Sequence, residues 1–148
     1  MIIFVCAELK EILKRQREYP WPRPDVCACC GASKVWGHGF VLAYFDGIAS
    51  GIYIRRYRCP GCGCVIRLRP RGYFRRLQAS IRTIRKSLYE RIVKGRYLSG
   101  VSRSRQRHWL NGLVRNTAAH FGNTWAGRLM EAFERLLDMG KVPVSSSV

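Results

Sequence analysis

The chain has 148 residues, of which 27 are Lys or Arg and 9 are Asp or Glu, so its formal charge is +18 at pH 7. A charge of this size attracts polyanions and steers their approach. The apolar content of 47% is enough for a real core, which excludes a chain that is disordered throughout, and the length suits one or two small domains.

The N-terminal segment is apolar and then polar. Residues 1–19 predict a short helix, or an apolar strand that runs into one, because Leu9, Ile12 and Leu13 have helical spacing. The apolar start is too short for a membrane span or a secretory signal. Residues 20–24 are rich in proline and predict a stiff, extended linker. We therefore expect a cytoplasmic protein with no membrane partner.

Two cysteine pairs have the spacing of metal ligands. Cys27 and Cys30 form a C-x2-C unit followed by glycine, and Cys59 and Cys62 form a second. This spacing lets neighbouring thiolates reach one metal, and the glycine lets backbone N–H groups turn toward sulfur. Two such units, separated by a strand-like stretch, are typical of a four-cysteine zinc ribbon. We expect these thiolates to hold one structural Zn²⁺ in a reducing compartment.

The segment between and around these pairs is expected to form a small three-stranded sheet. The predicted strands are residues 35–41, 52–58 and 64–68. Such a sheet is too small to be stable on its own core. A structural zinc ion supplies the missing stabilisation, of order 10 kcal/mol.

The remaining cysteines and one histidine are expected to have structural roles. Cys29 could replace one of its neighbours as a ligand, but its spacing to the following glycine is worse. Cys64 is expected to pack on the sheet, and Cys6 to be a buried apolar residue. His38 could bind metal, but four better thiolates are available, so we expect it to form a hydrogen bond within its strand.

A basic helical segment is predicted from residue 73 to about residue 115. Its first helix has an apolar residue every three or four positions and ends at Gly95. After a short turn, Ser102 can cap a second helix over residues 103–115. The apolar stripe of the first helix consists of Phe74, Leu77, Ile81, Ile84, Leu88 and Ile92.

The positive charge is concentrated on this segment. Between residues 67 and 115 lie 15 of the 27 basic residues and a single acid, Glu90. Like charges kept together on a helix cost free energy unless a polyanion neutralises them. We expect the basic residues that flank the apolar stripe of the first helix to contact phosphates; these are Arg75, Arg76, Arg82, Arg85 and Lys86.

The second helix has a polar face suited to reading bases. At about 100° per residue, an apolar side forms from Trp109, Leu110, Leu113 and Val114, and we expect it to face the core. The opposite side has no acid and is rich in donors, as in a helix that enters the major groove. The nucleic-acid contacts expected from this helix are Arg103, Ser104, Arg105, Arg107, His108, Asn111 and Arg115, with Arg103 and Gln106 nearer the core side.

The C-terminal part predicts one more amphipathic helix, over residues 124–139, which closes the core or forms a partner face. Its apolar side is Trp125, Leu129, Phe133 and Leu136, and Gly140 ends it. The expected fold class is α+β. The expected parts are an N-terminal helix and linker at 1–24, the ribbon at 25–70, the basic segment at 71–118, a C-terminal helix at 119–140 and a disordered tail at 141–148.

These motifs follow one another in a recognisable order. His38-Gly39 follows the first cysteine pair, and the run Arg55–Gly63 surrounds the second. A Gly-x-Ser turn ends at Ser102, and Trp109 lies in the following helix. This order, over about residues 25–115, resembles the zinc ribbon and helix-turn-helix of bacterial insertion-sequence transposases. The resemblance implies recognition of transposon-end or similar DNA.

Such transposases cut DNA with three carboxylates that hold two metal ions. Of the nine acids here, Asp46 lies in a predicted turn of the ribbon, and the three C-terminal acids lie on one short helix. We therefore expect no catalytic activity. The expected function is zinc-dependent binding of double-stranded DNA by a mobile-element accessory protein or truncated transposase, located at the bacterial nucleoid.

The sequence leaves other partners and functions open. A separate transposase, or a second copy of this chain, is a further expected partner. An RNA- or ribosome-associated basic zinc protein is an alternative. A redox ribbon of the rubredoxin type is another, although such proteins are typically acidic.

Overall fold

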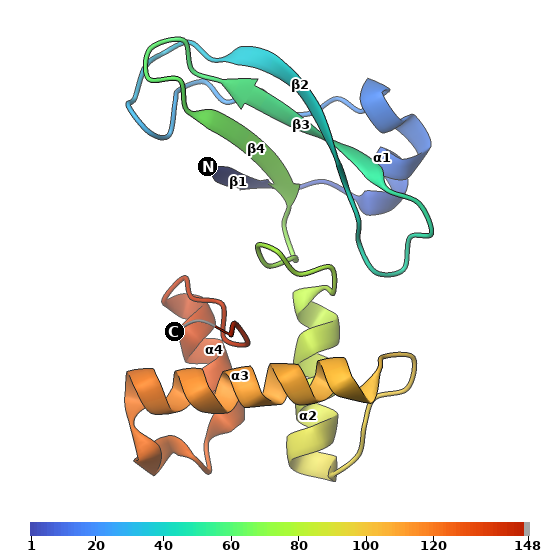
Figure 1. The fold of residues 1–148 in the computed structure, drawn as a ribbon, viewed down its shortest axis with the longest axis vertical. Helices are drawn as coiled ribbons and strands as arrows, with labels where there is room; N and C mark the ends of the chain where they lie inside the picture. The colour runs from blue at the N-terminus through green and yellow to red at the C-terminus, as the bar shows by residue number, and fades with distance from the viewer. Residues whose placement is uncertain (147–148) are drawn as a thin grey trace. The chain divides into compact units, whose positions relative to one another are not determined.

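The computed structural model describes residues 1–146. The chain divides into two compact units, Met1–Ser80 and Ile81–Val148, which we call the N-terminal unit and the C-terminal unit (Figure 1). A sheet and a short helix form the first, and the second is helical. The chain is therefore α+β, as the sequence predicts.

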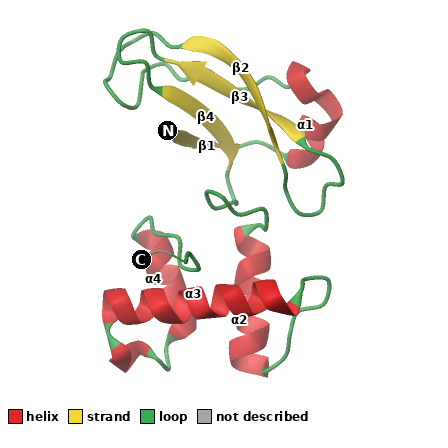
Figure 2. Ribbon diagram, viewed as in Figure 1, coloured by secondary structure: helices red, strands yellow, loops and turns green. Residues whose placement is uncertain are grey.

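The N-terminal unit is built on a four-stranded mixed sheet (Figure 2). Strands β1 (Ile2–Val5), β2 (Trp36–Ala43), β3 (Ile52–Arg58) and β4 (Val65–Pro70) lie in the order β1-β4-β3-β2. The last three strands are antiparallel neighbours and match the three predicted strands. However, β1 pairs in parallel with β4, so the observed sheet has one strand more than the three that the sequence predicts. Local periodicity does not reveal a partner so distant in sequence.

The core of this unit lies between the sheet and the N-terminal helix. Helix α1 (Leu9–Arg15) continues into the 3-10 turn η1 (Gln16–Glu18), and Ile12 of α1 is fully buried. Trp21, in the predicted linker, is buried in the same core, so this proline-rich segment packs rather than standing free. The strands contribute Ile52, Ile54, Ile66 and Leu68, and full burial of such a side chain is worth about 1.5–3 kcal/mol.

The basic helix begins later than predicted. Helix α2 spans Ile81–Lys94, and residues 73–80 form turns instead. The Arg69 guanidinium donates to the carbonyl of Leu77 at 2.7 Å, and the Asp46 backbone N–H donates to the carbonyl of Gln78 at 3.1 Å. Phe74 and Leu77 continue the apolar spacing of α2, which predicts a helix. Instead, the Leu77 N–H donates to the Phe74 carbonyl in a turn, and Arg69 and Asp46 fix the carbonyls that follow.

The C-terminal unit packs three helices together: α2, α3 (Arg103–Phe121) and α4 (Leu129–Asp138). Ser102 caps α3 as predicted, because its side chain accepts a hydrogen bond from the Arg105 backbone N–H at 3.3 Å. Helix α3 extends past the predicted end near residue 115. The buried apolar side chains of the three helices are Ile84, Leu88, Trp109, Leu113, Ala132, Phe133 and Leu136.

The last helix is shorter than predicted. The 3-10 turn η2 (Asn123–Trp125) comes first, and α4 begins only at Leu129. Trp125 stacks on Phe121 with ring centroids 4.6 Å apart, so it belongs to the turn and not to the apolar side of α4. Within residues 1–146 no helix is long and apolar enough to cross a membrane.

The tail expected to be disordered is folded as far as residue 146. Val144 is 1% exposed, and the Asn116 side-chain amide donates to the carbonyls of Pro143 and Ser145 at 3.1 and 3.0 Å. Single hydrogen bonds from α3 hold the tail in place. The sequence of the tail has no helix or strand periodicity, so it gives no sign of these contacts. The last two residues of the predicted tail lie outside the described residues.

Candidate metal centre and basic helix surface

The two cysteine pairs lie in loops of the same local shape. In the first, the Gly31 N–H donates to the carbonyl of Cys27 and the Cys27 N–H to that of Ala32, both at 2.8 Å. In the second, Gly63 donates to Cys59, and Cys59 to Cys64, both at 3.0 Å. Both glycines have positive φ, 73° and 72°, which glycine adopts without strain. Each loop thus presents one buried cysteine, Cys27 or Cys59, and one exposed cysteine, Cys30 or Cys62.

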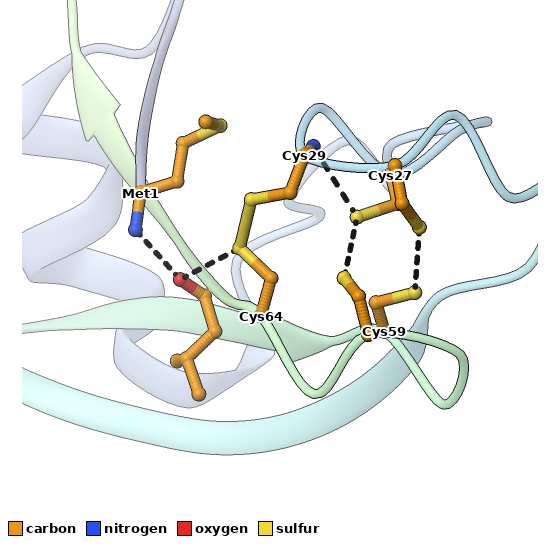
Figure 3. Close-up of a disulfide and its surroundings, with 8 residues drawn as sticks. Met1, Cys27, Cys29, Cys59 and Cys64 are labelled. Atoms are coloured by element: carbon orange, nitrogen blue, oxygen red, sulfur yellow. Dashed lines mark hydrogen bonds between the residues drawn. A yellow bond between two sulfur atoms is a disulfide. The ribbon is translucent and has the colours of Figure 1, made fainter.

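The four predicted ligand sulfurs come together between these loops (Figure 3). They all lie within 4.8 Å of one another. The Cys27 and Cys62 sulfurs are 3.7 Å apart, and those of Cys30 and Cys59 are 3.6 Å apart. With Zn–S bonds of about 2.3 Å, a regular tetrahedron requires sulfurs about 3.8 Å apart. These four side chains are therefore close enough to hold one metal ion, as the sequence predicts.

The two loops act differently on their thiols. The Cys64 backbone N–H lowers the pKa of Cys62, but the hydrogen bond with the Cys30 thiol and burial outweigh it and raise that pKa to about 12. The backbone N–H groups of Cys30 and Cys29 lower the pKa of the Cys27 thiol to about 7, and the Cys29 N–H lies 3.4 Å from the Cys27 sulfur. Only a thiolate binds metal, so Cys27 is prepared to be a ligand near neutral pH.

The two surplus cysteines near this cluster are joined to each other. Cys29 and Cys64 form a disulfide, with Cα atoms 6.7 Å apart (Figure 3). The sequence prediction had Cys64 packing on the sheet and did not foresee this pairing, because no local signal links residues 35 positions apart. The Cys29 and Cys64 sulfurs also lie within 4.8 Å of the Cys27 sulfur. Cys6 is exposed rather than buried.

Most of the predicted polar side of α3 faces solvent. Trp109 and Leu113 are buried as expected, whereas Val114 is 48% exposed, which corrects its placement on the core side. Gln106 is buried, as its placement nearer the core side predicts, whereas Arg103, placed on the same side, is exposed. Helix α3 also buries Asn116 and Thr117. Of the predicted contact residues, Arg105 is half-buried, and the exposed ones are Arg103, Ser104, Arg107, His108, Asn111 and Arg115. The Arg115 guanidinium is additionally hydrogen-bonded to the carbonyl of Ser146 at 2.6 Å.

The other predicted phosphate contacts do not share one helix. Arg82 and Lys86 are exposed on α2. Arg85 forms a two-point ion pair with Glu134 of α4, with the shorter hydrogen bond at 2.6 Å, so it is engaged within the C-terminal unit. Arg75 and Arg76 lie in the turns of residues 73–80. The idea that they flank a helical stripe is therefore wrong.

The connection between α2 and α3 is organised by one buried amide, Gln106, which the sequence places nearer the core side but without these partners. Gln106 accepts hydrogen bonds from the Leu98 N–H and the Ser87 hydroxyl, both at 2.9 Å. It donates to the carbonyls of Leu98 and Val101, both at 2.8 Å. Because the connection covers residues 95–102, it is longer than the usual helix-turn-helix turn of about three or four residues.

Glu90, the single acid of the basic segment, is neutralised locally. Its carboxylate accepts hydrogen bonds from Arg96 at 2.5 Å and from Lys94 at 3.1 Å. The hydrogen bond from Arg96, and then that from Lys94, lowers the pKa of Glu90. This carboxylate therefore does not offset the charge of the exposed side of α3.

Comparisons of the chain with protein-family models, with curated proteins and with solved structures found no match. The resemblance to transposases gains no support from them.

Proposed function

We propose that this chain is a zinc-stabilised nucleic-acid-binding protein that binds double-stranded DNA through α3. The observation that carries the proposal is the outer face of this helix, where Arg103, Arg107, His108 and Asn111 are exposed. No acid occurs anywhere in α3. Guanidinium groups suit phosphates and guanine, and a carboxamide suits adenine. Such a face matches the surface that a major groove requires.

Zinc is the proposed ion of the cysteine cluster. Four thiolates form a soft donor set that favours zinc over magnesium or calcium. Four protein ligands leave no open position on a tetrahedral ion, which is the pattern of a structural site. We therefore propose a non-catalytic role, in which the ion stabilises the N-terminal unit.

The local charge balance supports a polyanionic partner. The 15 basic residues between positions 67 and 115 are accompanied only by Glu90, which is already paired with Lys94 and Arg96. Phosphates would neutralise the repulsion that remains among the cations, and the counterions that the phosphates release would favour binding further. The proposed biological setting is mobile-element DNA, following the order of motifs in the sequence.

Titration of the zinc-loaded chain with a fluorescent duplex at increasing salt tests this proposal. If about six to eight phosphates are neutralised, log K falls against log[salt] with a slope of about −5 to −7. Arg107→Gln lowers the slope magnitude by about 1, whereas Lys141→Gln, an equal charge change beyond α4, leaves it almost unchanged. A salt-independent affinity would contradict the proposal. Stronger competition by single-stranded RNA than by duplex DNA would favour the RNA-binding alternative.

A further inference from the structure

A second basic surface lies on the sheet of the N-terminal unit. It is a cleft of about 400 Å³ beside β1 and β4. Apart from Met1, Ile2 and Val65, the residues that line it are all arginines, and none is acidic. The five arginines are Arg56, Arg67, Arg69, Arg75 and Arg76; only the last two were expected to bind nucleic acid.

The strand register places two of these cations directly opposite each other. Arg56 of β3 and Arg67 of β4 are antiparallel partners, so their side chains leave the sheet on the same face. Arg69 lies two residues farther along β4 and shares that face. Like charges directly opposite each other destabilise a sheet. Among residues 1–146 none of the five arginines has an ion-pair partner, so this repulsion is not offset within the chain.

Two of the arginines also have buried donors without a partner. The Nε atoms of Arg56 and Arg69 are buried and form no hydrogen bond. Arg69 is only 9% exposed, and its guanidinium carbon lies 4.9 Å from the centre of the Phe45 ring. Burial, and then the nearby charge of Arg67, lowers the pKa of Arg69. A buried N–H without an acceptor is destabilising, so both arginines are held in place at a cost in free energy.

One further cation is held there at a conformational cost. Arg76 has φ 67°, in the left-handed region that non-glycine residues rarely adopt. A conformation of this kind is strained for a residue with a side chain. The segment that carries it is fixed by the hydrogen bond from Arg69 to the carbonyl of Leu77 at 2.7 Å. The cleft thus retains a cation in a strained position next to another that is partly desolvated.

We propose that this arginine cleft binds a phosphate group, supplied by the phosphodiester backbone of a nucleic acid. The planar guanidinium fork matches the oxygens of a phosphate, and several such groups can share one oxyanion. A bound phosphate would lie between the charges of Arg56 and Arg67 and offset their repulsion. This inference rests on the proposed function and adds a binding surface on the N-terminal unit. Free phosphate offers the same chemistry, so the experiment includes both sources.

The test uses the full, zinc-loaded chain and three variants. Arg67→Gln removes one of the opposed charges, and Arg76→Gly removes a charge together with the strained φ. Lys14→Gln is the matched control, because Lys14 is an exposed cation of α1 outside the cleft. For each protein, the affinity for a fluorescent duplex is measured over a range of salt, and the thermal midpoint with and without inorganic phosphate.

We expect each cleft variant to bind the duplex about tenfold more weakly, with the salt slope reduced by about 1, and the control to change by less than about twofold. Without anion, both cleft variants should be at least as thermostable as the parent chain, because repulsion or strain has been relieved. Weaker binding by a protein that is no less stable cannot be attributed to misfolding.

The other outcomes separate the cleft from the proposed function. If the parent chain binds the duplex and the cleft variants match Lys14→Gln, the cleft proposal is overturned and the proposed function stands. If the parent chain binds no nucleic acid, but inorganic phosphate raises its thermal midpoint and not that of Arg67→Gln, the cleft is a site for free phosphate and the proposed function is overturned. If neither ligand binds, both proposals fail.

Discussion

Gly112, in the middle of α3, lies directly against the backbone carbonyl of Val144. A methyl group added at Gly112 would overlap the carbonyl oxygen of Val144. Glycine in a helix interior costs about 1 kcal/mol relative to alanine, so α3 accepts this cost to let the C-terminal segment pack closely. The glycine is therefore a packing feature of the helix.

Gly112→Ala should destabilise the C-terminal unit. Overpacking of this kind costs about 1–3 kcal/mol, which exceeds the gain in helix propensity. Chemical denaturation followed by far-UV circular dichroism measures the difference. Gly127→Ala is the control, because a methyl group there meets nothing within 4 Å. In a chain shortened to residue 140, Gly112→Ala should become neutral or stabilising. Equal destabilisation with and without residues 141–148 would contradict the contact.

Removal of one ligand should empty the metal centre. Cys59 is fully buried and its sulfur lies 3.6 Å from that of Cys30, so Cys59→Ser should lower the zinc content of the purified chain to near zero. Cys6→Ser should leave it at one ion per chain, because Cys6 is exposed and lies outside the cluster. Elemental analysis measures the zinc content of both proteins. Full zinc retention by Cys59→Ser would contradict the assignment of Cys59 as a metal ligand.

Removal of zinc should affect one unit and spare the other. All four candidate ligands lie in the N-terminal unit, whereas α2, α3 and α4 belong to the C-terminal unit. A chelator should therefore raise amide exchange in the strands, since a structural ion contributes of order 10 kcal/mol to a small domain. The buried parts of α3 should keep their protection. Hydrogen-exchange mass spectrometry resolves both regions, and equal loss of protection in both would show that the units do not fold separately.

Glu90 should make the connection between α2 and α3 sensitive to acid. Hydrogen bonds from Arg96 and Lys94 hold its folded pKa below the ordinary value, which is about 4.3 in an unfolded chain. The contribution of Glu90 to the stability of this connection is thus fully present above about pH 4.3, and it is lost as the pH falls through the lower pKa of the folded state. Amide exchange over residues 81–98 should rise in that window in the parent chain. In Glu90→Gln it should be raised already at neutral pH and change less on acidification. Identical profiles would refute this role.

Asn111 should contribute to sequence preference more than to affinity. Its carboxamide is exposed on the outer side of α3 and can pair with adenine in a two-point contact, worth about 1–3 kcal/mol of discrimination. Selection from random duplexes should yield a motif for the parent chain, and Asn111→Ala should lose one or two positions of it. If the parent chain selects no motif, α3 does not read bases, and binding through it is non-specific.

The sequence predicts the parts of this protein that depend on local spacing. The pairs at Cys27 and Cys59 were recognisable because each loop repeats the same spacing and the same glycine. The cap at Ser102 and the burial of Trp109 and Leu113 follow from helical periodicity. These features depend on residues no more than a few positions apart, where geometry allows few alternatives.

The features that sequence analysis missed depend on distant partners. The parallel pairing of β1 with β4, the Cys29–Cys64 bond and the contact of Val144 with Gly112 all join segments far apart in the chain. The turns at Phe74 have helical apolar spacing, yet long-range hydrogen bonds override it. The arginine cleft was missed for the same reason, because only strand pairing places Arg56 opposite Arg67.

The Cys29–Cys64 bond connects the same two loops that present the candidate metal ligands. An ion that leaves the four thiolates would therefore leave behind loops that are still tethered, and the ligands could not diffuse apart. Recapture would be an intramolecular search at high effective concentration, of the kind that short linkers provide. The N-terminal unit, opened by loss of the ion, would then refold from loops that are already tethered, and the centre would regain its ion reversibly.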